Sequence, residues 1–400
     1  MNRNINVTSV SNYKIITTNN LFELNSQSSN ELLALIKTNR VFIVIDTNLQ
    51  RNIIEEFFKL NNINPTFISF NSNELSKNFN NVNYLIEELI NYKLKRKEPI
   101  IAIGGGITLD LVGFVASIYR RGVPYIKIST TLLSIVDVSV GIKTGINYGN
   151  LKNRIGTFYH PLASFNAVNM LTSLSDKHII NGIGEIIKIA LVRSNELFDL
   201  LYIYADELLK TKFQTEIGFK IIKLSIELMA EELENNIYET NLERKVDYGH
   251  IFSKLFELED NWLHGEAVAI DGFFSVILSY VKGYISLEIL SVIYQVMLKL
   301  KLPTYTTLTL ELLLEALEDS KEHRNGFINL PLLFGSIGNC IIENNINNYE
   351  LTKALQIFDI INETKNLQGF IYSNNDKNYN FIMNNSNSVI KIISTGNINN

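Results

Sequence analysis

The sequence predicts an α/β protein in which a parallel sheet, with helices on both of its faces, precedes a mostly α-helical region. Buried-type strands alternate with amphipathic helices over roughly residues 1–170. From about residue 174 long helical stretches dominate instead. The chain has 400 residues, which is enough for two or three domains with full hydrophobic cores.

The alternation can be followed segment by segment. Short runs rich in Val, Ile and Phe predict buried strands, and apolar residues at spacings of three and four predict helices. The polar residues 1–20 are expected to form a strand or an arm. The predicted strands are residues 41–48, 66–70 and 99–106, and the predicted helices are residues 50–63, 81–97 and 107–122.

The second half of the chain changes character. Its long apolar periodic stretches predict helices at residues 177–192, 195–210, 217–234 and 268–283. Residues 366–400 are rich in Asn and are expected to form a loosely structured tail. No internal repeat is visible.

Composition excludes several classes of function. The formal net charge of −5 argues against a general nucleic-acid-binding surface, although a local basic pocket stays possible. The single cysteine, Cys340, excludes an internal disulfide and a cysteine-built metal site. The N-terminus lacks the apolar core of a signal peptide, and no uncharged apolar run reaches the ~18 residues of a spanning helix. A cytoplasmic protein is expected.

A glycine-rich turn at residues 104–106 joins a predicted strand to a predicted helix. Glycine permits positive φ and close approach of a ligand, and the helix N-terminus behind it favours a phosphate. The spacing is not that of the dinucleotide fingerprint, so a purely structural turn is an equal alternative. Asp46 follows another strand end, where ligands bind in such sheets; alone it would more often be a helix cap.

Four cationic residues lie among Gly, Thr and apolar neighbours that look buried. They suggest an anion pocket for a phosphorylated substrate, against the usual alternative of a solvated surface. The four are Arg121, Lys143, Lys152 and Arg154.

A glutamate and two histidines could hold a metal. Glu185 and Lys188 lie three residues apart on one face of a predicted helix, and His250 and His264 open successive helical segments. Such a set with open coordination positions suits a catalytic divalent ion that polarises a hydroxyl or carbonyl. Each histidine taken singly would more often be structural.

Several separated blocks, in order, resemble the sugar phosphate cyclase superfamily, of which 3-dehydroquinate synthase is the best-known type. These blocks include IIAIGGG, STTLLSIVDVSVGIKTGIN, GIGEIIK, VDYGH and HGEAVAID, within roughly residues 40–345. The resemblance implies a Rossmann-like NAD-binding α/β domain at residues 1–172 and a helical metal and substrate domain at 173–365. Residues 366–400 would be the tail. It also implies a homodimer with the active site in the cleft between the domains, acting on a small sugar phosphate.

The resemblance also implies roles for particular residues, motif by motif. NAD would be held by Asp46, Glu74, Lys77, Gly104, Gly105, Gly106, Asp110, Thr130 and Thr131. Zinc or cobalt would be held by Glu185, His250 and His264. The substrate would be lined by Asp137, Lys143, Lys152, Asn153 and Lys188, with Arg121 near its phosphate, and Asp247 and Lys254 occupy further positions of the same motifs.

Departures from the dehydroquinate synthase pattern indicate a different substrate. Met229 stands where that branch has a lysine, Glu243 where it has an arginine, Asp247 for an asparagine and Lys254 for a histidine. The first two changes remove two positive charges and add a negative one. Leaving a substrate carboxylate unpaired, or facing a like charge, is costly, so a substrate without a carboxylate is favoured.

The blocks VDYGH-x-FS, HGEAVAID, EHRNG and INLPL are similar to the 2-epi-5-epi-valiolone synthases. That similarity implies cyclisation of sedoheptulose 7-phosphate, with phosphate elimination through transient NAD oxidation and an intramolecular aldol closure. Lys254 departs from this branch too, where a proline is expected. The alternatives are a 3-dehydroquinate synthase, a desmethyl-4-deoxygadusol synthase, a metal-dependent polyol dehydrogenase and a non-catalytic binding protein.

Overall fold

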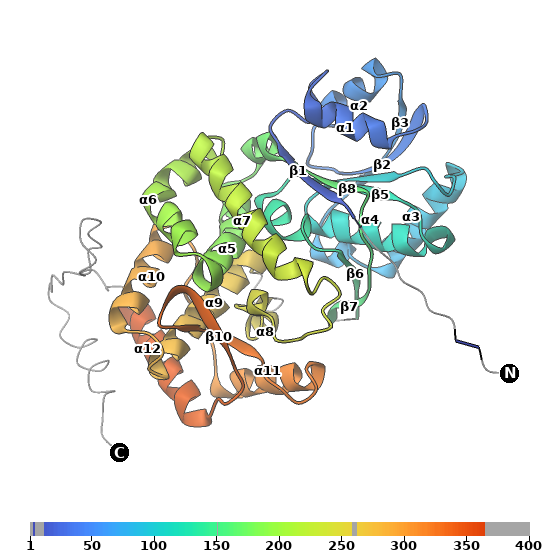
Figure 1. The fold of residues 1–400 in the computed structure, drawn as a ribbon. Helices are drawn as coiled ribbons and strands as arrows, with labels where there is room; N and C mark the ends of the chain where they lie inside the picture. The colour runs from blue at the N-terminus through green and yellow to red at the C-terminus, as the bar shows by residue number, and fades with distance from the viewer. Residues whose placement is uncertain (1–2, 5–11, 150, 258–261, 365–400) are drawn as a thin grey trace. The chain divides into compact units, whose positions relative to one another are not determined.

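A computed structural model describes residues 3–4, 12–149, 151–257 and 262–364, in two compact units that meet in sequence between Leu174 and Ser175 (Figure 1). The predicted domain limit lies at residues 172/173, two residues earlier. The predicted Asn-rich tail at 366–400 lies outside the described residues. None of the described helices is long and apolar enough to span a membrane.

Unit 1 is built on a six-stranded parallel sheet of order β1-β8-β5-β4-β2-β3. Its central strands are largely apolar and buried, as expected of strands covered on both faces, and the buried Lys127 of β5 is the main departure. The predicted N-terminal strand or arm contains β1. The strands are β1 (Lys14–Thr18), β2 (Arg40–Asp46), β3 (Asn64–Phe70), β4 (Ile100–Gly104), β5 (Tyr125–Ser129) and β8 (Ala163–Ala167).

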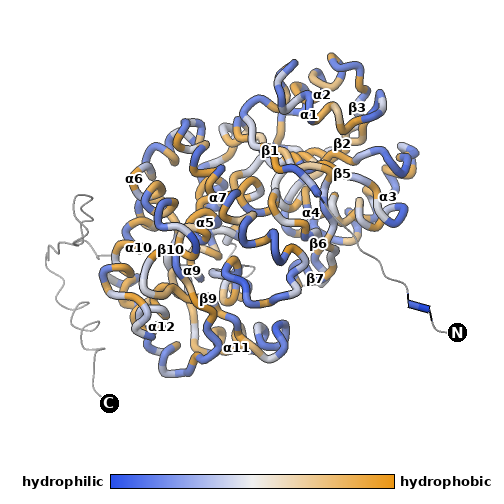
Figure 2. Tube along the Cα trace, in the orientation of Figure 1, coloured by the Kyte–Doolittle hydropathy of each residue, from blue (hydrophilic) through white to orange (hydrophobic). Residues whose placement is uncertain are grey.

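Helices cover both faces of this sheet. One core packs helices α1 and α2 against it through Leu32, Ile54 and Phe57, and the other packs α3 and α4 through Leu85 and Val112. In Figure 2 the strands labelled β2 and β5 are largely hydrophobic, whereas the helices around them carry hydrophilic as well as hydrophobic residues. The predicted parallel α/β fold is confirmed. The helices are α1 (Gln27–Leu35), α2 (Arg51–Leu60), α3 (Phe79–Asn91) and α4 (Gly106–Ile118).

The helix predicted to reach residue 97 ends earlier, at Asn91. Lys93 adopts a left-handed conformation with φ 57°. The amide of Leu94 then donates to the carbonyl of Leu89 at 3.1 Å, which closes the helix end, and the Leu94 side chain is fully buried. The helix therefore ends so that Leu94 can be buried, although the basic residues 95–97 have good helical propensity.

Two further pieces of unit 1 were not predicted. An antiparallel hairpin, β6 (Lys143–Tyr148) and β7 (Leu151–Phe158), projects from the sheet domain as a separate two-stranded ribbon. A turn of π-helix, Ser134–Val138, leads from β5 toward that hairpin. Both lie within residues 134–158, the segment in which Lys143, Lys152 and Arg154 suggested an anion-binding pocket. The irregular structure therefore falls in the part of unit 1 where a binding site was expected.

Unit 2 is mostly helical, as predicted, with one unpredicted antiparallel pair of strands, β9 (Leu330–Phe334) and β10 (Ser336–Glu343). Helix α9 lies at its centre, because every residue from Gly265 to Ser279 is buried. Helices α5, α10 and α12 pack around α9. The helices are α5 (Asp176–Arg193), α6 (Asn195–Thr211), α7 (Glu216–Glu234), α8 (Ser253–Glu257), α9 (His264–Val281), α10 (Leu287–Lys299), α11 (Leu310–His323) and α12 (Asn348–Thr364).

Candidate metal centre and cofactor site

Two glycines let helices α5 and α9 cross in backbone contact. A Cβ on Gly184 would lie 1.9 Å from the carbonyl oxygen of Gly265, and a Cβ on Gly265 would lie 1.8 Å from that of Asn181. Glycine is therefore required at both positions for close approach. Glu185 follows the first glycine and His264 precedes the second, so the crossing itself brings these two side chains together.

Glu185, His250 and His264 offer ligand atoms that all lie within 4.8 Å of one another. The Nε2 atoms of His264 and His250 lie 3.2 and 3.6 Å from Oε1 of Glu185. Lys188 Nζ lies 2.5 Å from the other oxygen, Oε2. His264 begins α9 as predicted, whereas His250 lies in the turn before α8. The structure thus gathers the three residues that the sequence proposed as metal ligands.

Each histidine is oriented through its other ring nitrogen. His250 Nδ1 lies 3.0 Å from the carbonyl oxygen of Tyr248, and His264 Nδ1 lies 3.4 Å from Oε1 of Glu257. A carbonyl or carboxylate behind the ring is the usual arrangement for a histidine that binds a metal through its other nitrogen. Glu257 was missed by sequence reasoning, because a glutamate in a short helix carries no distinguishing signal.

Burial and charge set the protonation of this cluster. Burial would raise the pKa of Glu185, but the Lys188 ammonium and the two imidazoles outweigh burial and hold this pKa well below its usual range. Burial, together with Lys188, lowers the pKa of His250 to about 3. Burial opposes charge on His264 as well, yet hydrogen bonds to Glu185 and Glu257 raise its pKa. His250 is therefore neutral at ordinary pH.

These residues fit a divalent cation. Both carboxylate oxygens of Glu185 are buried without a well-formed hydrogen bond among the described residues. When Nδ1 of neutral His250 donates to the carbonyl of Tyr248, Nε2 of the same ring carries a lone pair and no proton. This lone pair faces Oε1 of Glu185, which is also an acceptor. Acceptors that face one another this way are what a metal ion satisfies.

The glycine-rich turn in unit 1 lies against several predicted cofactor residues. A Cβ on Gly104 would lie 2.8 Å from Oγ1 of Thr108 and 3.3 Å from Cβ of Asp46. A Cβ on Gly105 would lie 3.1 Å from Cγ2 of Thr131. None of the three glycines adopts a positive φ, so of the two properties that glycine permits, close approach is the one that this turn uses. Gly105 is the N-cap of α4, as a phosphate-binding turn requires.

The remaining residues at this strand edge have defined partners. Asp46 accepts hydrogen bonds from the backbone and side chain of Asn48 within a local turn, and the helix-cap alternative is wrong because the N-cap of α2 is Gln50. The amide of Thr130 donates to the carbonyl of Gly104 at 3.1 Å, which ties the end of β5 to the turn.

A second polar cluster joins the first part of unit 1 to the β6–β7 hairpin. Lys77 Nζ lies 2.6 Å from both Oδ2 of Asp110 and Oδ1 of Asn153. Lys152 Nζ lies 4.0 Å from Oε1 of Glu74. Predicted cofactor residues and predicted substrate residues therefore share one cluster, although they lie far apart in sequence.

Asn147, which sequence reasoning missed, connects this cluster. Its Nδ2 donates to Glu74 at 2.7 Å, its backbone amide donates to the Lys77 carbonyl, and its Oδ1 accepts from the amide of Asn153. No sequence signal distinguished it, because asparagine is abundant throughout the chain. Of the other predicted residues, Lys143, Arg154 and Arg121 are exposed, and Asp137 lies in the π-helical turn.

Family models for the N-terminal and C-terminal parts of 3-dehydroquinate synthase match residues 67–181 and 182–323. The chain belongs to the 3-dehydroquinate synthase family. A 2-epi-5-epi-valiolone synthase of Actinomyces sp is 36% identical over 86% of this chain and 94% of its own. A 3-dehydroquinate synthase of Campylobacter concisus is 34% identical over 82% of this chain and 94% of its own. The resemblance predicted from the motifs is confirmed.

A solved structure shares this fold with high similarity. It is the 2-epi-5-epi-valiolone synthase of Streptomyces hygroscopicus subsp. jinggangensis with NAD⁺ and Zn²⁺ bound. The two chains superpose with a TM-score of 0.86 at 30% identity, over 90% of this chain and 99% of the other. This similarity confirms the predicted fold class.

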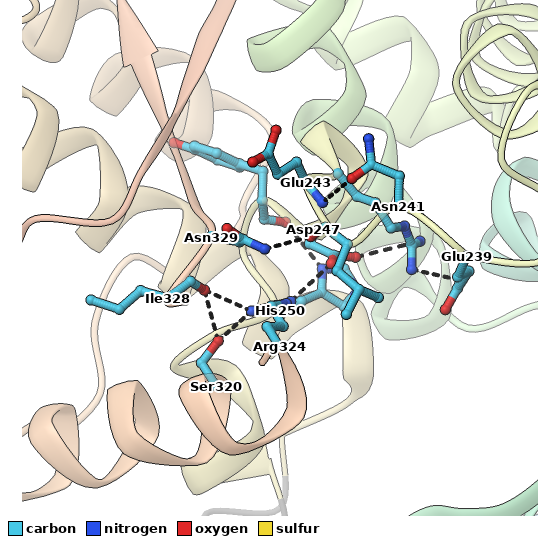
Figure 3. A network of polar contacts seen from close by, with 12 residues as sticks. Glu239, Asn241, Glu243, Asp247, His250, Ser320, Arg324, Ile328 and Asn329 are labelled. Atoms are coloured by element: carbon cyan, nitrogen blue, oxygen red, sulfur yellow. Dashed lines mark hydrogen bonds and ion pairs between the residues drawn. The ribbon is translucent and has the colours of Figure 1, made fainter. Parts of the chain in front are cut away.

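Within this family member, Asp247 is the centre of an ion-pair network (Figure 3). Arg324 donates to its Oδ2 at 2.8 Å, and Arg244 lies 3.4 Å from its Oδ1. Arg244 also pairs with Glu239 at 2.5 Å. All four side chains are less than 20% exposed, so this is a largely desolvated network of two positive and two negative groups.

The network refines the charge argument made from the sequence. Glu243, which replaces an arginine of the dehydroquinate synthases, is exposed, and the next residue, Arg244, brings a guanidinium to Asp247. Positive charge is therefore present in this region, but Asp247 and Glu239 already balance it. Met229 stands where the dehydroquinate synthase pattern has a lysine, and it is 2% exposed. A buried apolar side chain therefore takes the place of that cation.

Lys254 is half exposed on α8 and lies 3.5 Å from Asp319 of α11. Asp271, which sequence reasoning also missed, is fully buried on α9 and accepts the amides of Phe252 and Ser253 at 2.7 and 2.9 Å. It thereby fixes the turn that follows His250. A carboxylate between the apolar runs AVAI and GFFSVIL was the available signal.

Proposed function

We propose that this chain is a 2-epi-5-epi-valiolone synthase. It would convert sedoheptulose 7-phosphate into a C7 cyclitol, releasing phosphate through transient oxidation by NAD and an intramolecular aldol closure. The reaction class is supported by the identity to 2-epi-5-epi-valiolone synthases and by the gathered Glu185, His250 and His264. Net oxidation, as in a polyol dehydrogenase, is not part of this proposal.

NAD would bind unit 1 at the glycine-rich turn. The pyrophosphate would lie at the N-terminus of α4, which Gly105 caps, and the glycines let Asp46 and Thr131 pack directly against this turn. Glu74, Lys77, Asp110, Thr130 and Thr131 complete the proposed set. When bound, NAD⁺ supplies a hydride acceptor that makes the adjacent carbon acidic and then returns the hydride.

A zinc or cobalt ion would bind unit 2 at Glu185, His250 and His264. When bound, the ion lowers the cost of removing a proton from a substrate hydroxyl. Lys188, 2.5 Å from Oε2 of Glu185, keeps that oxygen engaged and turns Oε1 toward the two imidazoles. Its ammonium is 3% exposed, so it is also a candidate proton donor to a bound hydroxyl.

Asp247 and Met229 would select the substrate by disfavouring one that has a carboxylate. A substrate carboxylate placed near the Asp247 network would meet a carboxylate whose arginines are already paired, and a buried methionine offers it no charge. A carbinol, by contrast, can donate a hydrogen bond to Asp247 without an electrostatic penalty. Arg121, Lys143, Lys152 and Asn153 would contact the phosphate and the sugar chain.

The test measures phosphate release from sedoheptulose 7-phosphate and, in parallel, from 3-deoxy-arabino-heptulosonate 7-phosphate, with NAD and Zn²⁺ present. Turnover of the first substrate alone is the expected result, and product NMR then distinguishes the valiolone from 4-deoxygadusol-type cyclitols. Turnover of the keto acid alone would overturn the proposal in favour of a divergent 3-dehydroquinate synthase. A homodimer in the cytoplasm is a further part of the proposal, and the native mass of the purified protein tests its assembly.

A further inference from the structure

Lys127 is buried in the middle of β5, between β4 and β8. Its side chain is fully inaccessible to solvent, and the rest of the strand, Tyr-Ile and Ile-Ser, is buried as well. A buried ammonium is costly unless it is fully hydrogen-bonded. Lysine is a common residue type and no motif marks this one, and neither the glycine-rich turn nor the metal cluster includes it.

The ammonium of Lys127 holds the two ends of one short turn. Nζ donates to the carbonyl oxygens of Val138 and Gly141, each at 2.8 Å. The carbonyl between them, that of Val140, accepts a short hydrogen bond from the hydroxyl of Tyr13. Three carbonyls within residues 138–141 thus accept hydrogen bonds from the side chains of Lys127 in β5 and of Tyr13, which immediately precedes β1.

This turn separates two residues of the proposed substrate site. Asp137 immediately precedes Val138, and Lys143, the first residue of β6, follows two residues after Gly141. The turn also lies against the phosphate-binding glycines, because a Cβ on Gly106 would lie 3.2 Å from Cγ2 of Val138. The position of the turn therefore fixes where Asp137 and Lys143 stand relative to the glycine-rich turn.

We propose that Lys127 is a positioning residue that holds the 138–141 turn so that Asp137 and Lys143 are presented to the substrate. This proposal rests on the function proposed above. Two donors on one rigidly packed side chain hold both ends of the turn, which no apolar residue could do. The carboxylates of Asp110 and Asp137 stabilise the charged form electrostatically, so the ammonium is part of the local charge balance.

The test compares Lys127→Met, Lys127→Arg and a control, Lys282→Met, with the full-length wild type. Lys282 is likewise a poorly exposed lysine, bonded to the carbonyl of Asn345 and to Glu350, but it lies in unit 2 outside the proposed machinery. We expect Lys127→Met to lower kcat/KM by about a hundredfold, the size of effect expected when reacting groups are displaced by about 1 Å. Its Kd for NAD should change by less than about threefold, and Lys127→Arg should recover most of the loss.

Hydrogen exchange measured by mass spectrometry supplies a readout that does not depend on turnover. In Lys127→Met, exchange should rise in peptides covering residues 134–146 and stay unchanged in those covering 106–118. If Lys127→Met loses only thermal stability, like Lys282→Met, and keeps kcat, KM and exchange, Lys127 is a structural residue and the proposal fails. If Lys127→Met does not fold, Tyr13→Phe, which loosens the same turn, should give a smaller loss of kcat with faster exchange. Normal kinetics in Tyr13→Phe would then overturn the proposal.

Failure of the proposed function can be told apart from failure of the Lys127 proposal, because the wild-type protein itself would then not turn over sedoheptulose 7-phosphate. If the wild type acts on the keto acid instead, the same variants are compared on that substrate, since Asp137 and Lys143 would serve either one. If the wild type acts on neither, the exchange experiment alone decides whether Lys127 orders the turn.

Discussion

The two binding regions of this molecule satisfy their polar groups in different ways. In unit 1, Lys77 bonds to Asp110 and Asn153, so the cluster between the sheet and the hairpin is closed by its own charges. In unit 2, Glu185 is fully buried, Lys188 engages its Oε2, and its Oε1 faces the lone pair of neutral His250, so one acceptor is left facing another. A cluster that is satisfied without its ligand should fold without it, whereas a buried cluster that is unsatisfied should depend on the ion that completes it.

Glu185→Gln should have the largest effect, because it removes a proposed metal ligand from the unit 2 cluster. The neutral amide is a poor metal ligand and leaves the buried Lys188 ammonium without its counter-charge. Zinc content measured by plasma mass spectrometry should fall from about one ion per chain to near zero. Turnover should fall by about a thousandfold or more, because a metal ion supplies several kcal/mol of stabilisation.

Glu231→Gln is the matched control for that variant. Glu231 is exposed on α7 of the same unit and pairs with Arg193 on the surface. Its zinc content and turnover should equal those of the wild type. Full zinc occupancy in Glu185→Gln would contradict the assignment of the metal centre.

Glu257→Gln tests whether the residues behind the histidines contribute as well. The Glu257 carboxylate lies 3.4 Å from Nδ1 of His264 and is 10% exposed. Removing its charge should weaken zinc binding by roughly 10–100-fold, the usual cost of losing such a partner. Competition with a chelator of known affinity measures this effect, and Glu318→Gln, on an exposed part of α11, should leave the affinity unchanged.

The same contrast explains what the sequence could predict. Strand and helix alternation in unit 1 follows from local apolar patterns, and Glu185 and Lys188 share a helix face because of the helical period. The approach of His264 to Glu185, however, depends on the contact of Gly184 with Gly265, which is a tertiary event. Family resemblance, and not spacing, identified the three ligands together.

The residues that escaped prediction share a physical cause. Asn147, Glu257 and Lys127 act through partners outside their own helix or strand, and their residue types are common. The β6–β7 hairpin was hidden because its short strands alternate weakly and contain glycine. The charge argument at Glu243 needed the structure for a related reason, since the guanidinium close to Asp247 comes from the neighbouring residue, Arg244.

Asp247→Asn sharpens the argument about the substrate. Loss of this carboxylate leaves Arg324 and Arg244 with only part of their counter-charge, so the region becomes more attractive to a substrate carboxylate. The ratio of kcat/KM for the keto acid to that for sedoheptulose 7-phosphate should rise by about tenfold, the effect of roughly 1.4 kcal/mol. Asp199→Asn, a change at a partly exposed residue of α6, should not alter the ratio. An unchanged ratio in Asp247→Asn would remove this residue from substrate selection.

The smallest expected effect is a pH dependence that originates in unit 1. Burial lowers the pKa of Lys127 from 10.5 to about 8, against the opposing influence of Asp110 and Asp137. The folded pKa is depressed, so the ammonium that bonds to Val138 and Gly141 is present below pH 8 and is lost above it. If that charge orders the substrate turn, kcat/KM should fall by about tenfold between pH 8 and 9.5, in proportion to the loss of the protonated form. Lys127→Arg keeps its charge throughout this range, and its alkaline limb should therefore move to higher pH. Coincident alkaline limbs in the two proteins would show that the charge on Lys127 does not control activity.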